Sequence, residues 1–132
     1  CDNDKKPCDK SVLILGLTFK ENINDIRNTK VIDIIKGLKQ HGYSIDIHDP
    51  HAIPSEVKKE YGLKVFSKIP QGRQYDCVTL AVNHKAYTQM NVLDMEALLR
   101  YDSDIKPVIY DIKGVWKGIG FSNKNGLRYE TL

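Results

Sequence analysis

The residues after the first apolar run of the chain have the types and spacing to bind an anionic ligand that carries a ring. Lys20 can supply a mobile ammonium for a phosphate, and Arg27 a planar fork for bidentate contact with a phosphate or carboxylate. Phe19 could stack on a ring of the same ligand. The alternative is structural, with Phe19 in the core and both cations on the solvated surface. The stretch lacks the pattern G-x-G-x-x-G, so it does not predict the pyrophosphate turn of a dinucleotide site.

For several other candidate residues, the sequence favours a structural role. Asp49 precedes Pro50 and is expected to shape a turn rather than act as an acid or base. His84 could face a ligand cleft, but a histidine at a helix start or on the surface is the favoured interpretation. The spacing of the remaining histidines would scatter them over strand and turn positions, which argues against a metal site: His41, His48 and His51.

The three cysteines give little indication of redox or metal chemistry. Cys77 lies in an apolar run and is expected to pack in the core. Cys1 and Cys8 could form a bridge or share a metal, but no histidine or further cysteine lies near them in the sequence. Reduced thiols in a cytoplasmic protein are the favoured interpretation. The sequence therefore predicts no metal site.

Five runs of residues are expected to form strands, with helices between them. The run SVLILGL at residues 11–17 is continuously apolar, which is typical of a strand buried on both faces of a parallel sheet. The other expected strands are residues 43–48, a weak strand at 63–66, 75–82 and 107–112. A helix is expected at residues 31–41, with a cap at Asn28 or Thr29 and an apolar stripe. Further helices are expected at 55–61, 84–90 and 94–101, the last capped by Asp94. The stripe comprises Val31, Ile34, Ile35 and Leu38.

Strands that alternate with helices predict right-handed crossovers and a parallel sheet. We predict an α/β fold, a three-layer Rossmann-like open parallel sheet with the strands, numbered along the chain, in the order 3-2-1-4-5. Ligands of such sheets bind beyond the carboxyl ends of the strands, near the point where the order reverses. Residues 1–10 are expected to be a flexible lead-in. The tail from Val115 to Leu132 is expected to be a partly ordered extension that Trp116 anchors to the domain.

The composition is that of an ordinary globular domain and excludes several classes of protein. The 132 residues are 41% hydrophobic and 28% charged, which is typical neither of disordered nor of fibrous chains. The net charge of +3 is scattered, and no basic block predicts a nucleic-acid surface. No apolar run approaches the roughly 20 residues of a membrane span, and residues 1–10 are too polar for a signal peptide.

Four segments together resemble the C-terminal UDP-binding domain of the UDP-glucose/GDP-mannose dehydrogenase family. The first is the long pattern G-x-x-F-K-x-x-x-x-D-x-R that runs from Gly16 to Arg27. The others are Asp49-Pro50, the run AVNH at residues 81–84 and the run YDIK at residues 110–113. The resemblance covers residues 11–115, and the sequence of the first segment is most similar to the branch that oxidises UDP-N-acetylhexosamines.

The resemblance implies roles for four residues. Phe19 and Lys20 match a pair that contacts the nucleotide sugar, and Arg27 matches an arginine that reaches across an interdomain cleft toward NAD. Lys113 stands where many members have a substrate-contacting arginine, and lysine keeps the charge but loses the planar fork. The catalytic cysteine of the family lies outside the matched motif, so no catalytic residue is assigned in this chain.

The resemblance also implies the activity and partners of a larger enzyme, of which residues 11–132 would be the UDP-binding domain. That enzyme oxidises a sugar C6 hydroxyl to a carboxylate for surface polysaccharide synthesis, by two hydride transfers to NAD bound mainly by an N-terminal domain. The implied partners are the UDP-sugar, the N-terminal and central domains and further copies of the enzyme, but neither nucleic acid nor membrane. The alternatives are a stand-alone α/β binding or regulatory module, and a structural oligomerisation domain.

Overall fold

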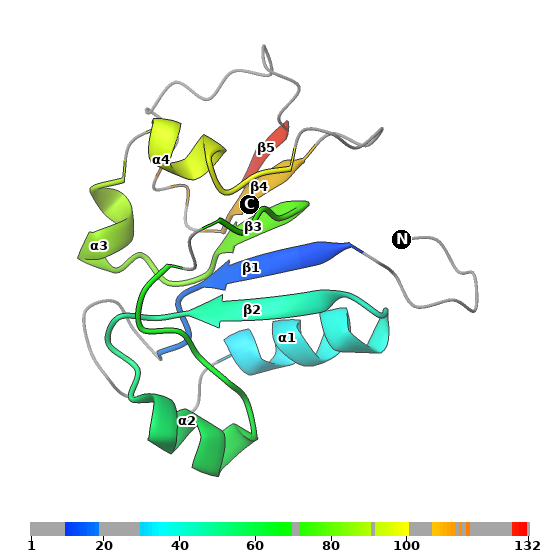
Figure 1. The fold of residues 1–132 in the computed structure, drawn as a ribbon, viewed down its shortest axis with the longest axis vertical. Coiled ribbons are helices and arrows are strands. Elements are labelled where there is room, and N and C mark those ends of the chain that lie inside the picture. Colours follow the sequence, from blue (N-terminus) through cyan, green and yellow to red (C-terminus); the bar gives the residue numbers. More distant parts are fainter. Residues whose placement is uncertain are drawn as a thin grey trace.

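A computed structural model describes residues 10–18, 30–69, 72–90, 92–100, 107–112, 114, 116 and 128–131. In this part of the chain an open sheet of five parallel strands has the order β2-β1-β3-β4-β5 (Figure 1). The strands are β1 (Ser11–Leu15), β2 (Ser44–His48), β3 (Cys77–Leu80), β4 (Val108–Asp111) and β5 (Arg128–Thr131). The helices are α1 (Val31–Gln40), α2 (Pro54–Tyr61), α3 (Lys85–Thr88) and α4 (Val92–Glu96). The α/β class predicted from the sequence is confirmed.

The continuous apolar run of β1 is explained by its position between β2 and β3. Successive side chains of a strand point to opposite faces of the sheet. Val12 and Ile14 accordingly pack in one hydrophobic cluster, and Leu13 and Leu15 pack in a second. Because both faces of β1 are covered, neither alternating position can be polar.

The helices lie on both faces of the sheet (Figure 1). On one face Val31 and Ile35 of α1 and Val57 of α2 pack against the first cluster. On the other face Tyr87 of α3 and Met95 of α4 pack in the second cluster. Within the described ranges, no helix combines the length and the apolar character that crossing a membrane requires.

The ends of two helices follow the glycines of the sequence. Gly62 ends α2 in the left-handed conformation with a φ of 68°, and Gly42 follows the last turn of α1 with a φ of 86°. The residue that precedes α1 is Lys30, which makes no capping hydrogen bond through its side chain. Asn28 and Thr29, the caps expected for α1, lie outside the described residues.

The predicted strand order is wrong at both edges of the sheet. Residues 63–66 make only a single parallel bridge, between His48 and Phe66, rather than a strand. At the opposite edge Arg128–Thr131 pairs with β4, where the sequence indicated only a partly ordered tail. The order 3-2-1-4-5 therefore becomes 2-1-3-4-5, because the weak run is lost as a strand and a strand is gained after β4.

Two helical expectations also need correction. The last helix starts at Val92 and ends at Glu96, so Asp94 lies in its first turn and is not its cap. In α1 the buried positions are Val31, Ile32 and Ile35, whereas Ile34 is 37% exposed. Trp116 is fully buried in the second cluster, in agreement with its expected role as an anchor.

The close approach of β1 and β3 at their carboxyl ends requires a glycine at position 16. Gly16 has a φ of +104°, and its amide donates to the carbonyl of His48 at 2.8 Å. A Cβ at this position would lie 2.6 Å from the Cβ of Val82 and 2.8 Å from its backbone nitrogen. Any side chain would therefore strain the backbone and collide with the segment after β3.

We expect Gly16→Ala to lower the free energy of unfolding by about 2–4 kcal/mol, through backbone strain and overpacking. The matched control is Gly37→Ala in α1, where an added Cβ meets nothing within 4 Å. That change should raise the stability by about 0.5–1 kcal/mol, because alanine loses less entropy in a helix. Urea unfolding of both variants measures the difference, and equal effects of the two substitutions would contradict the packing at Gly16.

Candidate functional site

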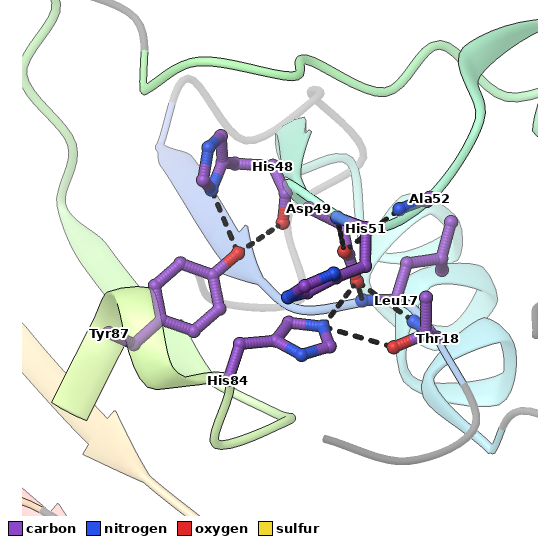
Figure 2. A network of polar contacts seen from close by, with 8 residues as sticks. All are labelled: Leu17, Thr18, His48, Asp49, His51, Ala52, His84 and Tyr87. Carbon is purple, nitrogen blue, oxygen red and sulfur yellow. Dashed lines mark hydrogen bonds and ion pairs between the residues drawn. The ribbon is translucent and has the colours of Figure 1, made fainter. Parts of the chain in front are cut away.

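A cluster of buried polar side chains lies where the order of the sheet reverses, at the carboxyl ends of β1, β2 and β3 (Figure 2). In open α/β sheets this switch point is the place where ligands bind. The side chains are Thr18, which follows β1, His48 and Asp49 at the end of β2, and His84 and Tyr87, which follow β3. All five residues are buried, so the cluster forms the floor of the edge rather than its surface.

Asp49 is the centre of this cluster. Its Oδ2 accepts hydrogen bonds from the backbone amides of Leu17 at 2.6 Å and Thr18 at 2.9 Å, and from His84 Nε2 at 2.9 Å. Its Oδ1 accepts from the amides of His51 at 2.7 Å and Ala52 at 3.1 Å. One carboxylate therefore ties the end of β1 and the start of α3 to the turn after β2 (Figure 2).

The hydrogen bonds keep Asp49 ionised although it is fully buried. Burial by itself raises the pKa of a carboxyl group. Here the bonds from His84 and from the amides of Leu17, Thr18 and His51 outweigh the burial and lower the pKa of Asp49 to about 2. The group is therefore a permanent anion at neutral pH, and it does not have the pKa of a general acid.

His84 joins the anion to α3. Its ring is fully buried, and Nε2 lies 2.9 Å from Asp49 Oδ2 and 3.0 Å from the hydroxyl oxygen of Thr18. Because the carboxylate can only accept, His84 Nε2 carries a proton and donates a hydrogen bond to Asp49. The carbonyl of His84 accepts from the amides of Tyr87 and Thr88 in the first turn of α3. His84 thus starts the helix and fixes it to the ends of the strands.

Tyr87 and His48 form a second buried pair beside Asp49. The hydroxyl of Tyr87 donates to the carbonyl of His48 at 2.8 Å and lies 2.8 Å from His48 Nδ1. Burial raises the pKa of Tyr87 and lowers the pKa of His48. Both side chains are therefore held neutral, which is typical of a polar contact that fixes a core and not of a proton-transfer pair.

A second buried carboxylate lies at the end of β4. Asp111 Oδ2 accepts from the amide of Trp116 and from the hydroxyl of Tyr129, both at 2.7 Å. Its Oδ1 is buried without a hydrogen-bond partner in the described part of the structure. The indole of Trp116 donates to the carbonyl of Tyr87 at 3.0 Å, so the segment after β4 is anchored to the segment after β3.

The four residues to which the sequence gives binding roles lie outside the described residues: Phe19, Lys20, Arg27 and Lys113. Their roles stay predictions. The structure does place the described residues next to two of them. Thr18 precedes Phe19 and is held by Asp49, and Ile112 precedes Lys113 and donates its amide to the carbonyl of Leu80 at 3.2 Å. Both segments thus leave from the carboxyl edge of the sheet.

The structural roles expected for Asp49, His84 and Cys77 are confirmed. Asp49 shapes its own turn through the amides of His51 and Ala52, and His84 begins α3. Cys77 is a free, half-buried thiol that packs against the first hydrophobic cluster, and burial raises its pKa. Cys1 and Cys8 lie outside the described residues. Among the residues that are described, no group of three histidine, cysteine or acidic side chains could hold a metal ion.

The contacts that join these residues could not be predicted from local sequence patterns. No pattern indicates a role for Thr18 or Tyr87, and the pattern at Asp49 indicates only a local turn. The partners of Asp49 on β1 lie 31 and 32 residues away, and His84 lies 35 residues away. The available signal was topological, because residues that follow neighbouring parallel strands meet at one edge of the sheet.

A groove of about 260 Å³ lies along the outer side of β2, away from this cluster. Three cations line it together with Asp46 and Phe66, and Arg73 forms an ion pair with Asp46 at 2.9 Å. Cationic side chains along an exposed sheet edge commonly prevent pairing with another chain. This role accounts for the groove without a ligand. The cations are Lys39, Lys64 and Arg73.

Comparison with known proteins matches residues 13–118 to the UDP-glucose/GDP-mannose dehydrogenase family, UDP binding domain. A UDP-N-acetyl-D-glucosamine 6-dehydrogenase of Salmonella typhi is 43% identical over 105 residues, which are 80% of this chain and 24% of that protein. One of the same name from Pseudomonas aeruginosa is 36% identical over 102 residues, which are 77% of this chain and 23% of that protein. The chain thus spans about a quarter of the length of these curated relatives.

Solved structures share the fold. An NDP-N-acetyl-D-galactosaminuronic acid dehydrogenase from Methanosarcina mazei Go1 superposes with a TM-score of 0.73 at 20% identity, over 93% of this chain and 24% of that one. The UDP-N-acetyl-mannosamine dehydrogenase Cap5O from S. aureus superposes with a TM-score of 0.65 at 23% identity, over 92% of this chain and 25% of that one. At these identities the likeness supports the fold alone.

The pKa of Asp49 predicts how the stability of the domain changes in acid. A carboxyl whose pKa is lower in the folded state stabilises that state above its unfolded pKa, and the gain is lost as the pH falls through the folded value. For Asp49 the window extends from about 3.8 down to about 2, which corresponds to about 2 kcal/mol. We expect Asp49→Asn to remove this part of the acid dependence of the unfolding free energy.

The control for this prediction is Asp46→Asn, since Asp46 lies in β2 with a quarter of its side chain exposed. This variant should lose stability in the same acid window as the parent chain. Urea unfolding at a series of pH values gives all three curves. Parallel curves for the parent chain and Asp49→Asn would show that the Asp49 carboxylate contributes nothing to acid stability.

Proposed function

The chain belongs to the UDP-glucose/GDP-mannose dehydrogenase family, and on that premise we propose that it binds the nucleotide part of a UDP-sugar within a larger NAD-dependent 6-dehydrogenase. The observation that carries the proposal is the family match over residues 13–118, which includes the segment after β1 at the switch point of the sheet. The proposed reaction is oxidation of the sugar C6 hydroxyl to a carboxylate. The proposed enzyme would act in the cytoplasm, in surface polysaccharide synthesis.

Phe19 and Lys20 are the proposed contacts to the nucleotide sugar. They follow Thr18, whose backbone amide is fixed by Asp49 at the end of β1. An ammonium close after a buried strand end can reach a diphosphate that lies over the carboxyl edge. Lys113 is the proposed further contact, since it follows β4 at the same edge of the sheet. Three groups from the ends of β1 and β4, which lie on either side of β3, would thus converge on one ligand.

Arg27 is proposed to act toward NAD from the same segment. It lies three residues before Lys30, which directly precedes α1, and seven residues after Lys20. A guanidinium offers several donors in a fixed plane and remains charged at any physiological pH. In the complete enzyme its role would be to contact NAD across the cleft between two domains, while Lys20 holds the UDP-sugar.

The described residues of this chain do not fit NAD itself. A dinucleotide site of the Rossmann type needs glycines that let the pyrophosphate approach free backbone amides at the end of the first strand. Here Gly16 is packed against Val82, and the amides of Leu17 and Thr18 already donate to Asp49. NAD, as the hydride acceptor, is therefore proposed to be held mainly by an N-terminal domain of the enzyme.

The proposed division of labour gives this chain a binding role. Residues 11–132 would form the UDP-binding domain after a lead-in of residues 1–10, and its partners would be the N-terminal and central domains of the same enzyme. Further copies of the enzyme complete the proposed assembly. The chain would hold the nucleotide and fix its direction, so that the C6 hydroxyl reaches the reacting groups on the other domains.

We expect calorimetry to show that the chain binds UDP, and that Lys20→Ala weakens the binding about tenfold to a hundredfold, because one charge-assisted contact is lost. Lys30→Ala is the matched control, because it removes the same charge from an exposed residue next to α1. It should leave the affinity unchanged. Absence of any UDP binding would favour a stand-alone module of another kind or a structural oligomerisation domain.

In the complete enzyme, Arg27→Ala should lower the affinity for NAD or the turnover, with a smaller effect on the UDP-sugar. The reason is the different reach of the two cations, with Lys20 over the nucleotide and Arg27 across the cleft. Steady-state kinetics with each substrate varied in turn measure the two effects separately. Unchanged Michaelis constants and turnover in both variants would mean that the segment is ordinary surface.

A further inference from the structure

Five N–H groups converge on the Asp49 carboxylate from three separate segments of the chain. Two amides come from the end of β1, two from the turn after β2, and one ring N–H comes from the start of α3 (Figure 2). The donor distances extend from 2.6 to 3.1 Å, and the carboxylate is fully buried. Such a convergence of donors is what proteins use to bind a phosphate or another small anion.

These five N–H donors, here called the cradle, lie where a ligand would be expected to bind. The amides of Leu17 and Thr18 directly follow β1, and His84 follows β3, so they stand on the two sides of the switch point. In sheets with the order 2-1-3-4-5 a ligand phosphate is bound at this place. Here the position is filled from within the chain, because Asp49 reaches the donors from the end of β2.

We infer that the Asp49 carboxylate is a built-in anion: it occupies the phosphate position at the end of β1 and closes that position to the phosphates of any ligand. The consequence for a diphosphate, which rests on the proposed function, is that side chains beyond Thr18 must hold it. This accounts for a segment in which Lys20 and Arg27 replace a glycine-rich turn. Backbone amides that already donate to a buried carboxylate cannot serve a second anion.

The low pKa of Asp49 agrees with this role. A group that titrated near neutral pH would leave the cradle without an anion, whereas the hydrogen bonds keep the pKa of Asp49 at about 2. Four other titratable groups lie around it. His84 donates to it through Nε2, and the ring of His51 lies 4.6 Å from that of His84. Burial lowers the pKa of His48 and raises that of Tyr87.

Chemical rescue of Asp49→Ala with formate tests the inference directly. The substitution removes the carboxylate and leaves its space, so formate should enter and accept the same hydrogen bonds. We expect the thermal midpoint of the variant to fall by about 10 °C in chloride, because buried donors lose their anion. Formate at the same ionic strength should restore about half of that loss or more, increasingly with concentration. Inorganic phosphate is the second probe and should also stabilise this variant more than chloride does.

Two further variants separate the cradle from general effects of salt. Asp49→Asn keeps the space filled with an uncharged group, so formate should not restore it. Asp46→Ala removes a partly exposed carboxylate of β2 and should respond to formate no more than to chloride. If Asp49→Ala is unfolded in chloride, the same titration is followed by circular dichroism, and formate should drive folding.

The inference is overturned if formate and chloride act alike on Asp49→Ala, or if formate stabilises the parent chain as strongly as this variant. Calorimetry of the parent chain with UDP is independent of these results. Rescue by formate without UDP binding would refute the proposed function and leave the built-in anion in place. UDP binding without rescue would do the reverse.

Discussion

A carboxylate that is removed from water must find its hydrogen bonds within the protein, and Asp49 finds five of them on three segments of the chain. Loss of any one segment from its place would leave a buried charge with too few donors. The carboxyl ends of β1 and β2 and the start of α3 are therefore held in one arrangement. The close contact of Gly16 with Val82 follows from the same convergence, since it brings β1 and β3 together at this edge.

This arrangement holds the chain in place at the carboxyl edge of the sheet. Asp49 fixes the chain up to Thr18, and Asp111 fixes the chain after β4 through Trp116 and Tyr129. Asp49 is buried and ionised, so its negative charge lies in the floor and not on the surface. The sequence has a lysine two residues after each fixed point, with Lys20 after Thr18 and Lys113 after Asp111. In the proposed function, these two lysines would bind the nucleotide diphosphate.

Much of the fold could be predicted from the sequence because it depends on local patterns. The apolar run of β1 predicts a buried strand, and the glycines after α1 and α2 predict the helix ends, each from a few neighbouring residues. The edges of the sheet could not be predicted in this way. Residues 63–66 have the apolar pattern of a strand yet make a single bridge, whereas the polar run Arg128–Thr131 is a strand only because β4 provides a partner.

The candidate site was predictable in part for the same reason. The family resemblance and the charges drew attention to the segment after β1, and the turn at Asp49-Pro50 was recognised from its residue types. The long-range role of Asp49 was not, because its partners are contributed by the ends of other strands. A local pattern indicates only that Asp49 can accept hydrogen bonds. The topology of the sheet decides which donors reach its carboxylate.

The most direct measurement is a titration of Asp49 by nuclear magnetic resonance, with the side-chain carboxyl carbon and the backbone amides observed together. We expect a midpoint near pH 2 for the carboxyl, and amide protons of Leu17, Thr18 and His51 that shift with the same midpoint. A midpoint near the ordinary value of 3.8, with these amides unaffected, would contradict the claim that one buried carboxylate holds the edge together.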